Sequence, residues 1–166
     1  LADDITEQKN AAVALQESAY RMRIASEAGR IGFHDYDIVG NSIVWDETLR
    51  AMWGVEPDES ITYETFVAGL HPEDRAATED AIARALDPSG DGAFRHEYRV
   101  IRRGSGEVCW IAATGQAFFA DGRAVRLIGT AQDVSERTRQ QAAMRLLADA
   151  GAVLALTVEA EARLER

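Results

Sequence analysis

Three consecutive segments with the periodicity of β-strands limit the folds open to this chain more than any other feature. In the first segment, residues 94–100, apolar and charged side chains alternate, as they do in a half-buried strand. A glycine-containing turn leads into the second segment, 107–120, and the pair Asp121-Gly122, which is typical of tight hairpins, leads into the third, 123–133. Because strands joined by tight turns pair with each other, we expect an antiparallel meander.

Two shorter strands and three short helices are predicted ahead of the meander. The strands, 31–38 and 42–45, flank a Gly-Asn turn. Asp46 is placed to cap a first helix that ends at Gly54, and Pro72 opens the third. The predicted helices are 47–53, 63–68 and 72–86. This order of elements favours an α+β fold, in which a five-stranded antiparallel sheet carries short helices on one face.

A long helix is predicted at each end of the chain. Residues 7–28 contain no Pro or Gly, and the final helix begins at Ser135 and keeps its pattern to Arg166. Apolar side chains recur on both helices at steps of three and four residues, which is the spacing of a coiled-coil seam. We therefore expect a parallel homodimer through the flanking helices. Its predicted seam residues are Leu15, Met22, Met144, Leu147, Leu154 and Val158.

The composition excludes several classes of function. A hydrophobic content of 46% in 166 residues supports one ordinary core and no second globular domain. The formal charge of −10 repels phosphate backbones and anionic lipid headgroups, so neither nucleic acid nor a membrane surface is an expected partner. The single cysteine cannot form an internal disulfide, and no apolar stretch approaches the length of a membrane span, so the cytoplasm is the expected location.

Two short runs of sequence echo each other at a spacing of 129 residues. They are residues 4–9 and 133–138, and each starts with an Asp that is followed three residues later by a Glu, which suits a helix N-cap. A spacing of this length fits one domain plus a linker helix. Since the chain also lacks an initiator Met, we expect it to be an excerpt from an array of domains.

Six sequence motifs, taken in order, resemble those of the PAS family of sensory domains. They are Ile31–Asp37, Trp45-Asp46, His71-Pro72-Glu73-Asp74-Arg75, Glu97-Tyr98-Arg99, Gly106-Glu107-Val108-Cys109-Trp110 and Gly129–Ser135. The resemblance implies a linker helix with the tail of a preceding PAS domain at residues 1–29, a PAS domain at 30–137, and a C-terminal signalling or coiled-coil helix at 138–166. From Leu146 onward this helix resembles the one that often leads into a GAF domain, the alternative being an ordinary linker coiled coil.

The same resemblance implies a role in relaying a signal. The expected parent is a bacterial multidomain signalling protein, with a sensor histidine kinase first and a cyclic-dinucleotide enzyme or a serine phosphatase regulator as alternatives. Expected partners are a second copy of the chain and neighbouring PAS, GAF or kinase domains. In one hypothesis a ligand or redox event shifts the last strand, and Asp133 and Ser135 pass the change to the final helix. In the other, the domain is a ligandless scaffold that dimerises its parent.

No cofactor is predicted, because the residues with which family members hold their cofactors are missing. Haem-binding members ligate iron with a His about one turn into the helix that begins at Pro72, and the matching residue here is Thr78, whose hydroxyl cannot replace an imidazole. Light-sensing members carry a reactive Cys in a G-x-N-C-R-F pattern, which is absent, and hold flavin with a Gln where this chain has Ala131. Haem and flavin are therefore disfavoured.

A mostly apolar pocket for a small organic ligand is compatible with the sequence. Its candidate lining residues are Tyr36, Trp53, Phe66, Thr78, Ile82, Leu127, Gly129 and Ala131. The alternative is that these side chains simply fill the core.

No catalytic or metal-binding site is predicted within the chain. No nucleophile with its base and no phosphate-binding glycine loop has the required spacing. The three histidines are scattered and lack the spacing of metal ligands. His71 is expected to cap a helix, and His34 and His96 are expected to lie half-buried on strands. Cys109 is expected to be inert packing. We therefore expect enzyme activity of the parent protein and not of this fragment.

Overall fold

The computed structural model of the chain describes residues 2–164, with the side chains of residues 9–20, 24 and 29–151. The chain divides into two compact units, Leu1–Asp133 and Val134–Arg166. The elements in chain order are α1 (Ala2–Gly29), β1 (Ile31–Asp37), β2 (Ser42–Trp45), α2 (Glu47–Trp53), α3 (Tyr63–Gly69), α4 (Pro72–Ala85), β3 (Ala93–Ile101), β4 (Val108–Ala120), β5 (Arg123–Asp133) and α5 (Ser135–Leu164).

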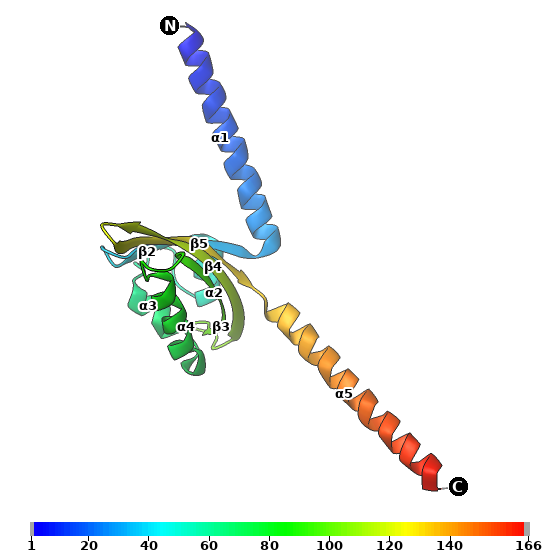
Figure 1. Cartoon of the computed structure of the whole chain (residues 1–166). Helices are drawn as coiled ribbons and strands as arrows, with labels where there is room; N and C mark the ends of the chain where they lie inside the picture. Colours follow the sequence, from blue (N-terminus) through cyan, green and yellow to red (C-terminus); the bar gives the residue numbers. More distant parts are fainter. Residues whose placement is uncertain (1, 165–166) are drawn as a thin grey trace. The chain divides into compact units, whose positions relative to one another are not determined.

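The five strands form one antiparallel sheet in the order β2-β1-β5-β4-β3 (Figure 1). The meander of β3, β4 and β5 is joined to the hairpin of β1 and β2 by the pairing of β1 with β5. This pairing runs from Ile31 opposite Gln132 to Asp37 opposite Arg126, so the first strand of the sheet lies beside the last. The predicted α+β fold with a five-stranded antiparallel sheet is confirmed.

Long helices precede and follow the sheet in the sequence, as predicted. A single residue, Arg30, separates α1 from β1, and a single residue, Val134, separates β5 from α5. The compact unit that holds the sheet ends at Asp133, four residues before the expected end of the PAS domain at residue 137. The division into 1–29, 30–137 and 138–166 stays a prediction.

Three of the helix caps named from the sequence form as expected, those at Asp46, Gly54 and His71, whereas Asp133 ends β5 two residues before α5 begins. Asp46 is the N-cap of α2, where its Oδ1 accepts a hydrogen bond from the Leu49 backbone N–H at 2.9 Å, and Gly54 ends this helix with a left-handed φ of 68°. His71 is the N-cap of α4, where its Nδ1 accepts a hydrogen bond from the Glu73 backbone N–H at 3.4 Å. These side chains satisfy backbone donors that the first turn of a helix leaves open.

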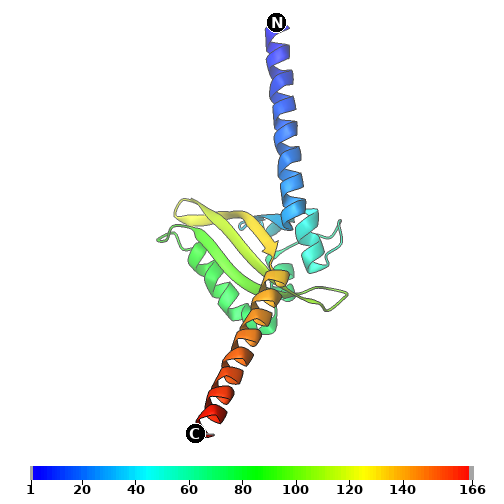
Figure 2. The same ribbon diagram turned by 90° about the vertical axis from the view of Figure 1, so that its right-hand side faces the viewer.

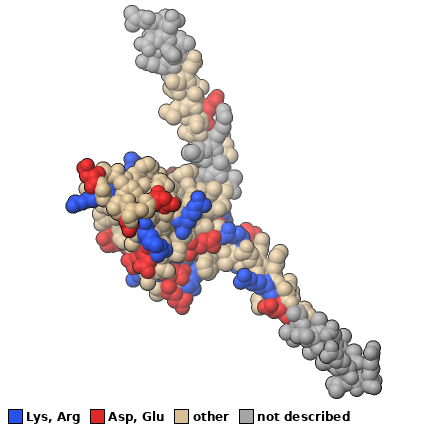
Figure 3. Space-filling model, viewed as in Figure 1, with Lys and Arg blue, Asp and Glu red and all other residues tan. Residues whose placement is uncertain are grey.

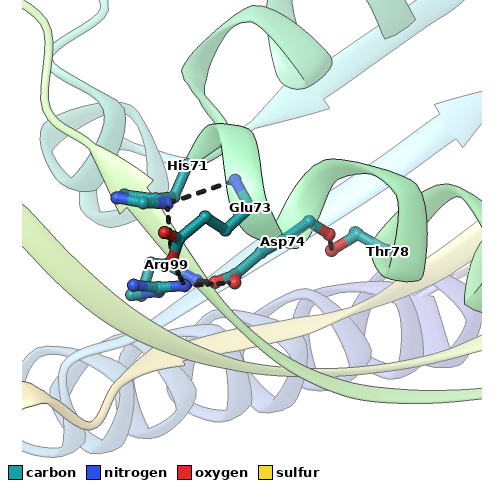
Figure 4. Close-up of polar contacts among 5 residues, drawn as sticks. All are labelled: His71, Glu73, Asp74, Thr78 and Arg99. Atoms are coloured by element: carbon teal, nitrogen blue, oxygen red, sulfur yellow. Dashed lines mark hydrogen bonds and ion pairs between the residues drawn. The ribbon is translucent and has the colours of Figure 1, made fainter.

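An ion-pair network fastens α4 to the sheet (Figure 4). Arg99 on β3 donates from Nε and Nη2 to the two carboxylate oxygens of Asp74, at 2.9 and 2.6 Å, and its Nη2 also reaches Glu73 at 2.8 Å. The Arg99 backbone N–H adds a further hydrogen bond to Asp74 at 2.8 Å. These bonds from Arg99 lower the pKa of the Asp74 carboxyl group. The network fixes the position of α4 against β3.

The short helices lie on one face of the sheet and enclose the core. Figure 1 and Figure 2 both show α3 and α4 on the concave face, and α2 packs on the same face, where Leu49 lies against Gly32. The largest fully buried side chains are Leu49, Leu70, Ile111, Val100, Thr78 and Cys109. On the side of the sheet unit seen in Figure 3, acidic and basic side chains are interspersed, so the net negative charge does not gather there in one patch.

A close approach in the centre of the sheet requires a glycine. His34, Gly129 and Gly115 lie side by side across β1, β5 and β4. A Cβ atom at Gly129 would lie 1.9 Å from the carbonyl oxygen of Thr114 and 2.7 Å from Nε2 of His34. The Thr114 carbonyl belongs to the backbone of a paired strand, so it cannot move aside without breaking the sheet.

We expect Gly129→Ala to lower the free energy of unfolding by about 3 kcal/mol, at the upper end of the range for an overpacked core. Gly115→Ala is the matched control, since its added methyl group would lie at least 3.1 Å from its neighbours, and we expect it to cost about 1 kcal/mol or less. Chemical denaturation of both variants measures the difference. Equal losses in the two variants would show that the close approach at Gly129 is unimportant.

Candidate functional site

A cavity of about 50 Å³ lies between the inward face of the sheet and the three short helices. It is lined by His34, Tyr36, Ile43, Trp45, Leu49, Trp53, Tyr63, Phe66, Ile82, Phe94, Tyr98, Leu127 and Ala131. These residues come from four strands and from α2, α3 and α4. The cavity is therefore an internal feature of the core.

Most of the pocket residues proposed from the sequence come together at this cavity. Those that line it are Tyr36, Trp53, Phe66, Ile82, Leu127 and Ala131. Thr78 does not line it: the residue is fully buried in α4, and its Oγ1 donates a hydrogen bond to the Asp74 carbonyl at 2.8 Å. Gly129 does not line it either. The ring of His34 lies beside the position that a Gly129 side chain would take, and His34 lines the cavity there instead.

Aromatic rings supply much of the cavity wall. The rings of Trp45 and Trp53 have centroids 4.8 Å apart, and Phe66 meets Tyr98 edge to face at 6.0 Å. Tyr63 stacks on Tyr36 at 5.8 Å. Sequence reasoning missed Trp45, Tyr63 and Tyr98 as lining residues, although the alternation of apolar and polar residues on the strands places Trp45 and Tyr98 on the buried face.

His34 brings an imidazole to this otherwise apolar wall. The ring lies beside the two facing glycines, Gly129 and Gly115, and makes a hydrogen bond with the backbone of Thr114. Burial lowers the pKa of His34, because the charged form loses its hydration, whereas the Thr114 bond and the nearby charge of Asp35 oppose this shift. The imidazole is therefore held neutral near pH 7. The sequence indicated a half-buried histidine on this strand but not its place at a cavity.

The size of the cavity limits what it can hold without movement. Ligand pockets usually enclose roughly 300–1,000 Å³, several times the volume found here. A larger ligand needs a wall to move outward, and α3 is the wall with the least packing, since none of its residues is fully buried. Tyr63 and Phe66, its two contributions to the cavity, are both half-buried.

The end of β5 is bonded to the end of α1. Gln132 donates a hydrogen bond from Nε2 to the Gly29 carbonyl at 2.9 Å, and the backbone N–H of Asp133 donates to the Arg30 carbonyl at 3.4 Å. The Arg30 guanidinium lies 3.9 Å from an Asp133 carboxylate oxygen. Of the two predicted relay residues, Asp133 therefore lies at this junction. Ser135 is buried at the first position of α5.

The predicted dimer seams lie on side chains that are exposed in the single chain. Leu15, Met144 and Leu147 are each more than two-thirds exposed. Val13, Tyr20 and Ile24 are also exposed on α1, and their spacing of seven and four residues forms a second apolar stripe that sequence reasoning missed. The remaining predicted seam residues, Met22, Leu154 and Val158, lie outside the described side chains.

Other candidate sites were searched within the described residues. There, no group of three or more His, Cys, Asp or Glu side chains is arranged to hold a metal ion. No helix in the same part of the chain combines the length and the apolar character needed to cross a membrane. Cys109 is buried, and Nη2 of Arg102 lies 3.3 Å from its sulfur, a contact that the sequence did not indicate.

Comparison with known proteins links this chain to signalling proteins. The sequence profile of the PAS fold matches residues 42–131. A blue-light-activated histidine kinase of Brucella anthropi is 28% identical over 82% of this chain and 27% of that protein. The probable diguanylate cyclase DgcE of Escherichia coli is 25% identical over 81% of this chain and 12% of that protein. The chain thus spans about a quarter or less of the length of these relatives.

A solved structure agrees with this similarity. The crystal structure of a sensory box histidine kinase/response regulator from Burkholderia thailandensis matches with a TM-score of 0.65 and 27% identity. The match covers 78% of this chain and 95% of that chain, so it extends well beyond residues 42–131.

The buried imidazole predicts a pH dependence of stability. Because the pKa of His34 is lowered on folding, the unfolded chain binds more protons just below pH 6.5, and stability falls as the pH falls from 7 toward 5. One such group contributes a slope of at most about 1.4 kcal/mol per pH unit. We expect His34→Phe to reduce the slope, as measured by denaturation at several pH values. An unchanged slope would contradict the assignment.

Proposed function

The chain belongs to the PAS fold family, and we propose that it is the sensory and relay module of a bacterial sensor histidine kinase. Its relatives include a histidine kinase and a probable diguanylate cyclase, so the family role in signalling proteins is common to different outputs. The proposed partners are a second copy of the chain and neighbouring PAS, GAF or kinase domains. We propose a cytoplasmic location for this part of the parent.

The observation that carries this proposal is that one strand serves both the cavity and the junction. Leu127 and Ala131 line the cavity from β5, and the next two residues after Ala131 bond to the end of α1. α5 begins immediately beyond them. A change that displaces Leu127 or Ala131 is therefore applied to the strand that leads directly into the final helix.

The junction gives a second route into the same strand. Gln132 holds the last carbonyl of α1, and Asp133 is bonded to Arg30, so a displacement of α1 also acts on the end of β5. The domain is thus suited to pass on either a ligand signal or a conformational signal from a preceding domain. In this proposal the parent protein carries the enzyme activity. The fragment changes its conformation and catalyses no reaction itself.

A second candidate function is that of a ligandless dimerisation scaffold in a cyclic-dinucleotide enzyme or a serine phosphatase regulator. The small volume of the cavity supports it, because the core is close to filled. The exposed side chains of Leu15, Met144 and Leu147 support it as well, since a partner helix is a suitable cover for them. Both candidate functions require a dimer. Only the relay also requires the bonds of Gln132 and Asp133 to the end of α1.

We expect Asp133→Ala in the full-length parent to uncouple the signal from the output. The expected cost in stability is about 1 kcal/mol or less, because the ion pair with the largely exposed Arg30 contributes little. The measurement is output activity with and without the stimulus. Asp80→Ala, which removes an exposed acid on α4, is the control and is expected to switch normally. Normal switching of Asp133→Ala would refute the relay.

The seam on α5 predicts a dimer of modest affinity. Leu147→Ala is expected to weaken it by a factor of about 10, since removing a seam leucine costs at least about 1.4 kcal/mol. Leu146→Ala is the matched control, because Leu146 is equally exposed but lies off the stripe of Met144 and Leu147. Sedimentation equilibrium measures both constants. A strictly monomeric wild-type chain at high concentration would count against the seam.

A further inference from the structure

The segment that carries α3 is anchored by a buried residue at each end. Ile61 is buried, and its carbonyl accepts a hydrogen bond from the Ile43 backbone N–H at 2.8 Å. Leu70 is buried as well and is bridged to Val100 on β3. Residues 62–69 between these anchors form the strap, and each of them is half-buried or exposed. A segment with firm ends and little burial between them is suited to open locally while the rest of the fold stays intact.

The strap separates the core cavity from a larger groove on the surface. Tyr63 and Phe66 line the cavity of about 50 Å³. Thr65, Ala68 and Gly69 line the groove, whose volume is about 350 Å³ and which also borders the turn between β3 and β4. An outward movement of the strap therefore has open space to enter and enlarges the cavity behind it.

Asn41 joins the strap to the sheet at the first turn of α3. Its side chain reaches over from the turn between β1 and β2. Oδ1 accepts a hydrogen bond from the Tyr63 backbone N–H at 3.1 Å, and Nδ2 donates to a carboxylate oxygen of Glu64 at 3.0 Å. The first turn of a helix leaves backbone donors open, and the N-cap Thr62 satisfies that of Thr65. Asn41 satisfies a further donor from a different element.

The chemistry of asparagine suits this position. Asn41 has a left-handed φ of 47°, which Asn adopts more readily than most other residues. Its amide carries an acceptor and a donor, so it meets a backbone N–H and a carboxylate at the same time. A ring contact adds to these bonds, since Tyr63 stacks on Tyr36 at 5.8 Å. The turn between β1 and β2 thus holds the start of the strap.

We propose that the strap is a gate to the cavity and that Asn41 is the latch that keeps this gate closed. In the open state the two bonds of Asn41 are broken, while the anchors at Ile61 and Leu70 stay in place. The inference rests on the proposed function, because it names what regulates access to the same cavity. The latch follows β1, which pairs with β5, so the gate and the relay strand belong to one sheet.

The rate at which a buried thiol is alkylated measures the opening of the gate. Ala131→Cys places a thiol on the cavity wall with a small increase in volume, and Cys109 supplies a buried thiol outside that wall. Treatment of the chain with iodoacetamide, followed by peptide mass spectrometry, gives a rate at each position. We expect position 131 to react faster than Cys109 and to depend less on urea, because a local opening exposes less surface than global unfolding. Equal rates with equal urea dependence would overturn the inference.

Asn41→Gly tests the latch, because glycine keeps the left-handed turn and removes the side chain. In the Ala131→Cys chain it is expected to raise the alkylation rate at position 131 about 10-fold, the effect of losing two hydrogen bonds. Asp91→Ala is the matched control. It removes a 2.9 Å bond from the Ala93 N–H at the start of β3, so it lowers global stability, and we expect it to leave the rate at position 131 unchanged. An unchanged rate in Asn41→Gly, or an equal rise in Asp91→Ala, would contradict the latch.

Amide hydrogen exchange keeps the inference falsifiable if Ala131→Cys does not fold. In the chain without the added thiol, Asn41→Gly is expected to speed the exchange of residues 66–69 about 10-fold, and Asp91→Ala is expected to leave it unchanged. The amide of Phe66 is a suitable probe, because it donates to the Thr62 carbonyl at 3.1 Å within the strap. Exchange of residues 66–69 that does not respond to Asn41→Gly would overturn the inference.

The failure of the gate is distinguishable from the failure of the relay. Asp133 lies at the junction with α1 and outside the cavity wall, so Asp133→Ala is expected to leave the alkylation rate at position 131 unchanged. An alkylation rate that ignores Asn41→Gly would contradict the gate and not the relay. A latch that behaves as expected, together with normal switching of Asp133→Ala in the parent, would contradict the relay and not the gate.

Discussion

The pairing of β1 with β5 is the interaction on which the rest of this structure depends. It joins two strands that are separated in the sequence by the other strands and three helices, and it makes one continuous sheet from a hairpin and a meander. Long-range pairing of this kind closes a large loop, so it forms only when both strands gain a buried face. His34 and Leu127 are among the residues that this pairing brings to the same cavity.

The same pairing explains why the cavity and the flanking helices are connected. Its register sets Ile31, the first residue after the α1 junction, opposite Gln132, the next-to-last residue of β5. The bonds of Gln132 and Asp133 to Gly29 and Arg30 follow from that register. A shift of β5 along β1 would exchange the inward and outward faces or break these bonds. In the proposed relay, this strand pairing is what couples the contents of the core to the two flanking helices.

Local features of this structure were predictable from the sequence, and long-range ones were only partly so. Caps such as Asp46 and His71 act within a few residues, which is why they form where the pattern indicates. The cavity depends on packing between distant elements, so Thr78 and Gly129 were wrongly placed on its wall. The Thr78 hydroxyl bonds to the backbone of its own helix, and the ring of His34 lies beside Gly129. The sequence alone does not indicate either arrangement, because both depend on how distant elements pack.

Hydrogen exchange along β5 and the start of α5 tests the coupling between cavity and helix most directly. With a small aromatic molecule bound in the cavity, the account predicts slower exchange in β5 together with a changed rate in residues 134–140. It also predicts that Asp133→Ala keeps the first effect and loses the second. Slower exchange that stays within the cavity-lining segments and leaves residues 134–140 unchanged in the wild-type chain would contradict it.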